Sequence, residues 1–446
     1  MFHKLLFGLA HECGDISFYM TYKRLIKNQW KPFEELRSEQ EKQLKQMIEF
    51  AYKNVPFYHN IFKGLGLLPR DIQTIKDLEK LPVLTKEIIK KNWEEFKPVN
   101  LSSLKYNEQA TGGSTGTPLK YRLSKNDRFL SGAILYRGWG YGGYQLGDKM
   151  IFLAGSSLNI SATSNITTKI HEIARNIRKL SSFDMGEREM HHYADVLNSF
   201  QPKYIYGYAS SLYFYAQWLE KNDITVPCPT AIFSTADKLY PHMRDTVSRV
   251  FDCEVFDGYG LNDGGVTAFE CQEHSGLHID TERSIMEIVG GDGLQVDEGE
   301  GQILATSLNN YAMPFIRYAT NDDVYLTDEE CGCGRKSKLL KEVLGRSVDV
   351  IVTPEGKNVH GWFFLYIFWE YCKGIKEYQV VQKTLDEIQI NIAIEDDFDE
   401  SQIEKIKQMI LTKSSNWRIT FNVVDKIKRT AAGKYKFIIN EMTKNV

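Results

Sequence analysis

The sequence predicts an α/β protein with a large N-terminal domain and a smaller C-terminal αβ domain. The main observation is a series of short apolar runs that end in glycine, serine or aspartate, with helical stretches between most of them: MIFLAG, YIYGYA, TAIFST and CEVFDGYG. Strands that alternate with helices form a sheet with ligand-facing loops at the strand ends. A second observation is a change of pattern near Gly345, which predicts one domain over residues 1–344 and another over 345–446.

In chain order, about the first 100 residues read as a mainly helical portion of the large domain. From Glu34 to Tyr58, apolar side chains recur at helical spacing among many charges, which predicts an amphipathic helix on the surface of a larger body. The small domain reads as the strands EYQVVQKT and EIQINIAIE, the helix ESQIEKIKQMILTK, the strand RITFNVV and a basic tail.

Composition and charge exclude several classes of protein. With 446 residues, 42% of them hydrophobic, the chain can bury a large core. A net charge of −3 gives no field that would attract nucleic acid or an anionic membrane, so we expect no nucleic-acid partner. No apolar run reaches the ~20 residues of a membrane span, and the N-terminal run is too short for a secretory segment. We therefore expect a cytoplasmic protein without an integral membrane segment.

The stretch ATGGSTGTP is a candidate phosphate-binding loop. It lacks the lysine of a Walker loop, and the alternation of Leu119, Tyr121 and Leu123 predicts that a strand, not a helix, follows it. The glycines would let consecutive backbone amides form an anion-binding nest, to which the hydroxyls add donors. A flexible turn between two strands is the alternative. The residues that would hold phosphate are Thr111, Gly112, Gly113, Ser114, Thr115, Gly116 and Thr117.

Together with later motifs, this loop resembles the adenylate-forming superfamily of acyl-coenzyme A synthetases, luciferases and peptide-synthetase adenylation domains. STADKL (234–239) is similar to the segment that lines the adenine pocket, and DGYGLND (257–263) to the tyrosine-glycine motif that ends in an acidic residue. RYATNDD (317–323) is similar to the motif whose aspartate holds the ribose. GRSVD (345–349) resembles the hinge before a mobile lid, and RTAAGK (429–434) the lid motif that ends in a catalytic lysine. The resemblance implies a large adenylation domain and a small mobile lid domain.

This resemblance gives individual residues a role. Lys434 would be catalytic, because a cation is needed where charge develops on the phosphate oxygens during attack by a carboxylate. Asp322 would accept hydrogen bonds from the ribose hydroxyls, Tyr259 would cover one face of the adenine, and Asp263 would bind magnesium. Further nucleotide-binding residues would be Ala236, Asp237, Asp257, Gly258, Gly260 and Arg346. For Lys434 the alternative is a solvated basic tail, because other basic residues surround it.

Two clusters of soft ligands predict a metal site. Cys331 and Cys333 stand one residue apart, and ECQEHSGLHID offers Cys271, His274 and His278. Cysteine thiolates and histidine nitrogens are the usual ligands of structural zinc, and four protein ligands leave no position for water. We expect Cys271, His278, Cys331 and Cys333 to bind zinc, with His274 as the substitute for His278. Free cysteines in ordinary loops are the alternative.

The cysteine pair, the compact size and the stretch 51–92 resemble the phenylacetate–coenzyme A ligase subgroup, and within it the CapK-like proteins of bacterial surface-polysaccharide gene clusters. The resemblance implies an AMP-forming ligase that uses ATP and Mg²⁺ to activate a small carboxylic acid. The acyl acceptor would be coenzyme A, a sugar, an amine or a carrier, and dimers are common in the subgroup.

Two alternatives accompany this hypothesis. One is an aryl–coenzyme A ligase of the phenylacetate type. The other is a non-catalytic, zinc-stabilised scaffold of a polysaccharide assembly complex, which three departures from the family pattern favour. Asp263 stands where glutamate is usual, Asn321 replaces a common glycine, and Val348 replaces an acid of the hinge motif.

Overall fold

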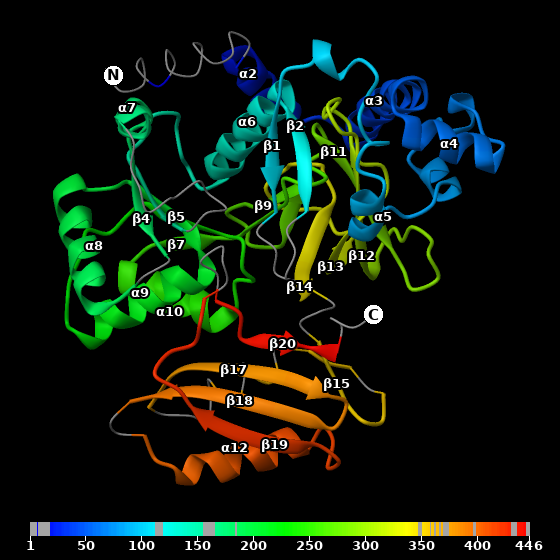
Figure 1. The fold of residues 1–446 in the computed structure, drawn as a ribbon. Helices are drawn as coiled ribbons and strands as arrows, with labels where there is room; N and C mark the ends of the chain where they lie inside the picture. Colours follow the sequence, from blue (N-terminus) through cyan, green and yellow to red (C-terminus); the bar gives the residue numbers. More distant parts are fainter. Residues whose placement is uncertain are drawn as a thin grey trace. The chain divides into compact units, whose positions relative to one another are not determined.

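The computed structural model describes residue 7 and residues 18–111, 119–154, 166–182, 185–346, 350–356, 358–360, 363–364, 367–368, 374–395, 398–429 and 435–442 (Figure 1). The chain forms two compact units. The larger unit extends to Leu344, and the smaller begins at Gly345.

A parallel five-stranded sheet forms one part of the larger unit, in the order β4-β3-β5-β6-β7. The predicted apolar runs form four of these strands, which confirms the α/β expectation. The strands are β3 (Met150–Ala154), β4 (Ile177–Ser181), β5 (Tyr204–Tyr208), β6 (Ala231–Thr235) and β7 (Glu254–Phe256). The helices around them are α2 (Phe18–Asn28), α6 (Lys125–Tyr141), α7 (Ile166–Arg175), α8 (Glu187–Phe200), α9 (Ala209–Lys221) and α10 (Pro241–Phe251).

Both faces of this sheet are apolar. Successive side chains of a strand point to opposite faces, so a continuous apolar run places apolar side chains on both of them. Ile151 and Ile205 pack in one buried cluster with α8, α9 and α10, which Figure 1 shows gathered on one side of the sheet. Tyr206 and Phe233 pack on the other face against Trp139 of α6. Helices on both faces leave the carboxyl ends of the strands as the place for a ligand.

A second, seven-stranded sheet has the order β11-β12-β13-β14-β10-β9-β8. Its pairs β8/β9, β9/β10, β10/β14, β11/β12 and β12/β13 are antiparallel. The strands are β8 (Gly258–Gly260), β9 (Thr267–Glu270), β10 (Leu277–Ile279), β11 (Ser284–Val289), β12 (Gly299–Ser307), β13 (Tyr318–Thr327) and β14 (Leu339–Arg346). β8 follows β7 directly, so the two sheets meet at Asp257.

The described N-terminal residues are mainly helical, as predicted, and from α3 onward they pack on this second sheet: Leu44 and Ile48 share a buried cluster with Ile285 and Ile303. The helices are α3 (Phe33–Asn54), α4 (Pro56–Leu65) and α5 (Lys86–Lys91), with short 3₁₀ segments at Pro69–Asp71, Lys76–Lys80 and Leu101–Ser103. The predicted helix from Glu34 to Tyr58 is wrong at its C-terminal end. Pro56 cannot donate a backbone hydrogen bond and pushes the preceding Val55 into an extended conformation, so α3 ends and α4 begins there.

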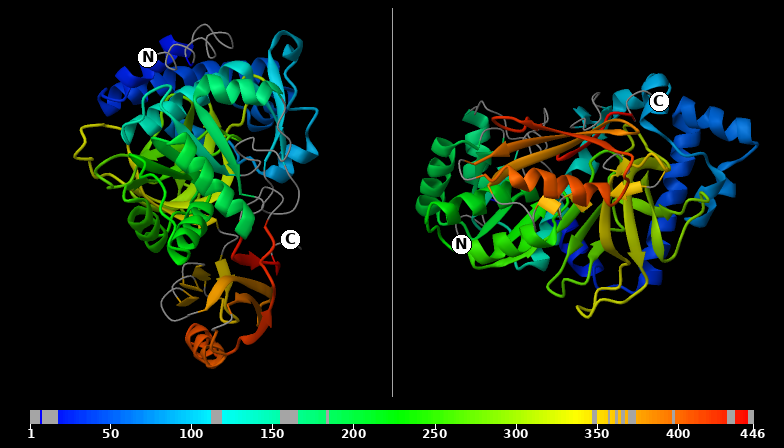
Figure 2. Two further views of the ribbon diagram at one scale, coloured as in Figure 1. Left: turned by 90° about the vertical axis from the view of Figure 1, so that its left-hand side faces the viewer. Right: turned by 90° about the horizontal axis from the view of Figure 1, so that it is seen from below.

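The smaller unit contains a four-stranded sheet in the order β19-β18-β17-β20, with α12 along one face (Figure 2). Ile388, Ile390, Ile406 and Ile410 form part of its buried core. The elements are β15 (Val350–Val352), β16 (Asn358–His360), β17 (Ile375–Thr384), β18 (Glu387–Ile394), α12 (Ser401–Leu411), β19 (Arg418–Val423) and β20 (Ile438–Asn440). The predicted strands and helix of this region are confirmed.

Among the described residues, the helices fall short of the length and apolar character that a membrane crossing requires.

Candidate active site

The predicted phosphate loop joins two antiparallel strands, β1 (Tyr106–Ala110) and β2 (Lys120–Ser124). Two hydrogen bonds close its base: the Thr111 N–H donates to the Leu119 carbonyl at 2.9 Å, and the Leu119 N–H donates to Thr111 Oγ1 at 3.0 Å. The loop therefore leads into a strand, as predicted. Outside the described residues lie the phosphate-binding candidates Gly112, Gly113, Ser114, Thr115, Gly116 and Thr117.

The predicted adenine segment follows the carboxyl end of β6. Ala236 adopts a left-handed backbone with a φ of 69°, a conformation that costs a residue with a side chain about 1–2 kcal/mol. The carboxylate of Asp237 accepts a hydrogen bond from the Ser210 hydroxyl at 2.6 Å, which ties the segment to the start of α9. A strained turn at the end of a parallel strand is typical of a ligand-binding loop.

Asp257 occupies the corner where β7 turns into β8. Its carboxylate accepts hydrogen bonds from the Ser234 hydroxyl at 2.5 Å and the Gly258 N–H at 2.9 Å, and its own N–H donates to Glu270 at 2.6 Å. Burial, with the nearby Glu270 carboxylate, raises the pKa of Asp257 to about 6. The corner that leads to Tyr259 and Gly260 is thus fixed by the Asp257 side chain and by Glu270 of β9.

Two of the predicted motifs are joined by tyrosine–carboxylate hydrogen bonds. Tyr259 of β8 donates through its hydroxyl to Asp322 of β13 at 2.8 Å, and Tyr318 of β13 donates to Asp263 at 2.9 Å. Both carboxylates are buried. The structure therefore brings together the residues predicted to bind adenine, ribose and magnesium.

Asn321, which stands where the family commonly has glycine, adopts a left-handed backbone with a φ of 62°. Asparagine is among the non-glycine residues that enter this region most readily. The substitution therefore preserves the backbone path that leads to Asp322.

Glu270 is the centre of a hydrogen-bond network that the sequence analysis missed. Its carboxylate accepts from Arg244 Nη2 at 3.0 Å and from the Asp257 N–H, and His274 Nδ1 lies 3.1 Å from its Oε1. Arg244 also donates to the Val255 carbonyl. The network ties α10 and β9 to the corner at Asp257. The available signal was an acidic residue inside the apolar strand TAFE.

The predicted metal ligands Cys271, His278, Cys331 and Cys333 converge, with ligand atoms that all lie within 4.8 Å of one another. The sulfurs of Cys271 and Cys331 are 3.5 Å apart, and His278 Nε2 lies 3.3 Å from the sulfur of Cys333. His278 Nδ1 lies 3.2 Å from the hydroxyl of Ser337, which orients the ring. Three thiols and one imidazole form a donor set that fits tetrahedral zinc.

His274 lies outside this cluster. The turn after Cys271 directs the His274 ring to Glu270. His278, which is buried on β10, faces the cysteines instead. The prediction that named His274 as the substitute ligand is therefore not supported by the geometry of the described residues.

The side chains of two predicted site residues lie outside the described residues. Arg346 is the last residue of β14, and its side chain lies outside the described residues, as does the whole of Lys434.

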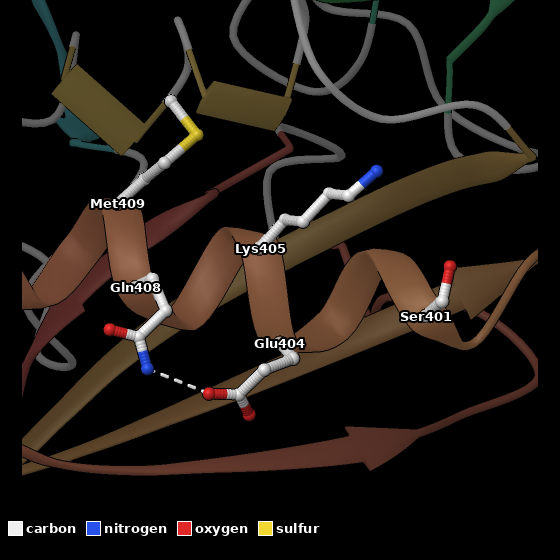
Figure 3. A pocket seen from close by; sticks show the side chains of 5 residues that line it. All are labelled: Ser401, Glu404, Lys405, Gln408 and Met409. Carbon is white, nitrogen blue, oxygen red and sulfur yellow. Dashed lines mark hydrogen bonds between the residues drawn. The ribbon is translucent and has the colours of Figure 1, made fainter.

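Two pockets of the described structure lie away from the predicted site residues. One lies on α12, where Lys405 and Met409 project on one side and Gln408 donates to Glu404 at 2.7 Å on the other (Figure 3). Because its lining comes from successive turns of one helix, it offers no converging polar groups. The other is lined by residues of α8: Arg188, Glu189 and His192.

Comparison with known proteins extends these observations. The CapK C-terminal domain family matches residues 351–441. Protein CapK of Staphylococcus aureus is 25% identical over 411 residues, which cover 90% of this chain and 89% of that protein. The phenylacetate–coenzyme A ligase of Thermus thermophilus is 26% identical over 396 residues, covering 82% and 83% of the two chains. That of Escherichia coli is 28% identical over 346 residues, covering 73% and 74%.

Solved structures show the same architecture. 2-Hydroxyisobutyryl-CoA ligase in the postadenylation state, in complex with R3-HIB-AMP, has a TM-score of 0.75 at 16% identity and covers 93% of this chain and 91% of that chain. Anthranilate CoA ligase AuaEII in complex with anthranoyl-AMP has a TM-score of 0.52 at 16% identity and covers 74% and 64%. At these identities the likeness establishes the fold.

The relatives together indicate an AMP-forming ligase, which is the enzyme class predicted from the sequence. The predicted resemblance and fold class are likewise confirmed: the chain is a homologue of CapK and of the phenylacetate–coenzyme A ligases, with the α/β fold of the adenylate-forming ligases.

Proposed function

We propose that this chain activates a carboxylic acid with ATP to an acyl-adenylate, releases pyrophosphate, and transfers the acyl group to an acceptor in bacterial surface-polysaccharide biosynthesis. The observation that carries the proposal is the pair of hydrogen bonds from Tyr259 to Asp322 and from Tyr318 to Asp263. These bonds join the two motifs that an adenylate-forming ligase would use for ribose and magnesium. The polysaccharide context rests on the resemblance to the CapK-like proteins of surface-polysaccharide gene clusters, and the chain is a homologue of CapK.

In the first step, a carboxylate oxygen of the substrate attacks the α-phosphorus of ATP. The bond from that phosphorus to the bridging oxygen breaks, and pyrophosphate leaves with the electron pair. Asp322 would hold the ribose hydroxyls and Tyr259 would lie against the adenine, while the loop 111–117 would bind the outer phosphates through its amides. Lys434, on a mobile lid, would stabilise the charge that develops on the phosphate oxygens. The walls around the base would be formed by Ala236, Asp237, Asp257, Gly258 and Gly260, and Arg346 would be a further nucleotide contact.

Magnesium fits Asp263, because a carboxylate oxygen is the ligand that this hard cation prefers. When bound, the ion would offset the negative charge of the phosphates. Asp263 is one methylene shorter than the usual glutamate, so a water molecule would complete the reach to the ion.

Zinc fits the four-residue cluster of three cysteines and His278. The role would be structural, because four protein ligands fill a tetrahedral coordination sphere. The ion would hold the turn that precedes β10 against the segment that precedes β14, next to the network around Glu270.

Coenzyme A is the acceptor in the alternative function, an aryl–coenzyme A ligase. The homology to phenylacetate–coenzyme A ligases favours it, and 2-hydroxyisobutyryl-CoA ligase is known in complex with 2-HIB-AMP and CoA. A sugar, an amine or a carrier is the acceptor that the polysaccharide context favours. The test is whether the acyl product forms only in the presence of coenzyme A.

The central experiment measures pyrophosphate release with ATP and magnesium across aromatic, fatty, hydroxy and amino acids, with hydroxylamine to trap the adenylate. The variant Lys434→Ala should lower the rate at least ~100-fold, about 2.7 kcal/mol, while nucleotide affinity changes little. Lys428→Ala is the matched control, because Lys428 is an exposed lysine of the same segment and should keep wild-type activity.

Three outcomes separate the hypotheses. Pyrophosphate release with one class of carboxylic acid, lost in Lys434→Ala, supports adenylation and identifies the class of acid that is activated. A rate that falls less than about threefold removes Lys434 from the mechanism. ATP binding without turnover of any acid favours the non-catalytic scaffold.

The cytoplasm is the compartment we propose, because ATP is a substrate and the zinc ligands must stay reduced. A homodimer stays a prediction of the subgroup resemblance, which a sedimentation measurement tests.

A further inference from the structure

We propose that Tyr318 is a positioning residue that sets the carboxylate of Asp263 for magnesium. The proposal rests on the proposed function, because it assigns Asp263 to magnesium. It concerns how this site reaches the required geometry with a side chain shorter than glutamate.

The first observation is the hydrogen bond itself. Tyr318 is fully buried on β13, and its hydroxyl donates to Asp263 Oδ2 at 2.9 Å. A buried tyrosine hydroxyl requires a partner, and a hydrogen bond to a carboxylate is stronger than one to a neutral acceptor. One oxygen of Asp263 therefore has a fixed direction before any ligand arrives.

The second observation is that Tyr318 also supports the backbone after Asp263. Gly264 has a φ of +99°, and a Cβ atom there would lie 2.7 Å from Ala305 Cβ and 3.2 Å from Tyr318 Cδ1. Only glycine lets the turn lie this close to the tyrosine ring. The same side chain thus fixes both the main chain and the carboxylate of Asp263.

The third observation is a reciprocal arrangement of the two motifs. Asp263 stands four residues after Tyr259, and Asp322 stands four residues after Tyr318. Each tyrosine donates to the carboxylate of the other segment. A shift of either segment would stretch a hydrogen bond to a buried carboxylate, so each carboxylate is held by the tyrosine of the other segment. This matters because an aspartate has less conformational reach than a glutamate and must be placed by its surroundings.

The experiment compares Tyr318→Phe with wild type in two binding measurements. AMP affinity, measured by calorimetry without magnesium, should change less than about threefold, because AMP needs no magnesium. ATP affinity is then measured across magnesium concentrations, and the concentration for half-maximal tightening should rise at least about fivefold. Tyr325→Phe is the matched control, since Tyr325 lies on the same strand but is exposed, and its magnesium dependence should equal that of wild type.

Several outcomes overturn the inference. An unchanged magnesium dependence in Tyr318→Phe, or a parallel loss of AMP and ATP affinity, shows that the hydroxyl does not set the magnesium ligand. If wild type binds neither nucleotide, the proposed function fails and this inference with it. If Tyr318→Phe does not fold, 3-fluorotyrosine at position 318 keeps the ring and the hydroxyl but changes its donor strength. A shifted magnesium dependence at unchanged AMP affinity then supports the inference, and an unshifted one overturns it.

Discussion

Replacement of Asp257 by asparagine tests the electrostatics of the corner between β7 and β8. The carboxylate accepts hydrogen bonds from Ser234 and Gly258, yet its burial and the nearby Glu270 raise its pKa from the ordinary 3.8 to about 6. Asparagine keeps an oxygen that can accept both hydrogen bonds and removes the charge that burial penalises. The substitution should therefore stabilise the protein at neutral pH.

The magnitude follows from proton linkage. The folded state binds the proton of Asp257 more tightly than the unfolded chain does. The contribution of this proton to the free energy of unfolding is therefore fully present below pH 3.8 and is lost as the pH rises through about 6. The displaced pKa corresponds to about 3 kcal/mol in total, of which about 1 kcal/mol falls between pH 5 and pH 7. These are upper limits, because Asp257 is half-buried. Relative to wild type, Asp257→Asn should gain up to about 1 kcal/mol over that interval.

Urea unfolding without nucleotide, followed by tryptophan fluorescence at several pH values, measures this difference. Asp252→Asn is the control, because Asp252 is exposed and its left-handed backbone suits asparagine, so its curve should run parallel to that of wild type. A constant offset between Asp257→Asn and wild type at every pH would refute the reasoning. A loss of stability in the variant towards pH 7 would refute it as well.

Two further substitutions test the strained turn and the metal cluster. Ala236→Gly removes the cost of a left-handed alanine and should raise the free energy of unfolding by about 0.5–1 kcal/mol, whereas a decrease would mean that the turn is unstrained. Cys333→Ser should lower bound zinc, measured by mass spectrometry after dialysis, from about one ion per chain to less than about 0.2. Cys228→Ser, at an exposed cysteine, should keep the wild-type zinc content, and equal zinc in both variants would exclude the cluster as the site.

Local patterns were sufficient for four strands of the parallel sheet, for β17, β18 and β19 of the smaller unit, and for the members of the Cys/His cluster. The apolar runs that end in glycine, serine or aspartate identified β3, β5, β6 and β7, because a strand buried on both faces needs a continuous apolar run. The four residues of the Cys/His cluster were identified because soft side chains are uncommon enough to stand out. The break at Pro56 was missed because helical periodicity continues on both sides of it.

The contacts between motifs could not be predicted in the same way. Tyr259 and Tyr318 are 59 positions apart, and their reciprocal bonds depend on how β8 and β13 are placed in the sheet. The choice between His274 and His278 also depended on tertiary structure, since both follow Cys271 closely. Only the fold shows that His274 faces Glu270.

The zinc cluster also has a consequence for how the chain is made. Cys271 and Cys331 are separated by 60 positions, so an ion shared between them would close a long loop of the nascent chain. A crosslink of that span removes about 4 kcal/mol of chain entropy from the unfolded state on the entropic account. In a cell starved of zinc, the newly synthesised chain would lack this aid, and a larger share of it would be left to chaperones and proteases. The supply of a trace metal would then limit how much of this ligase a cell can maintain.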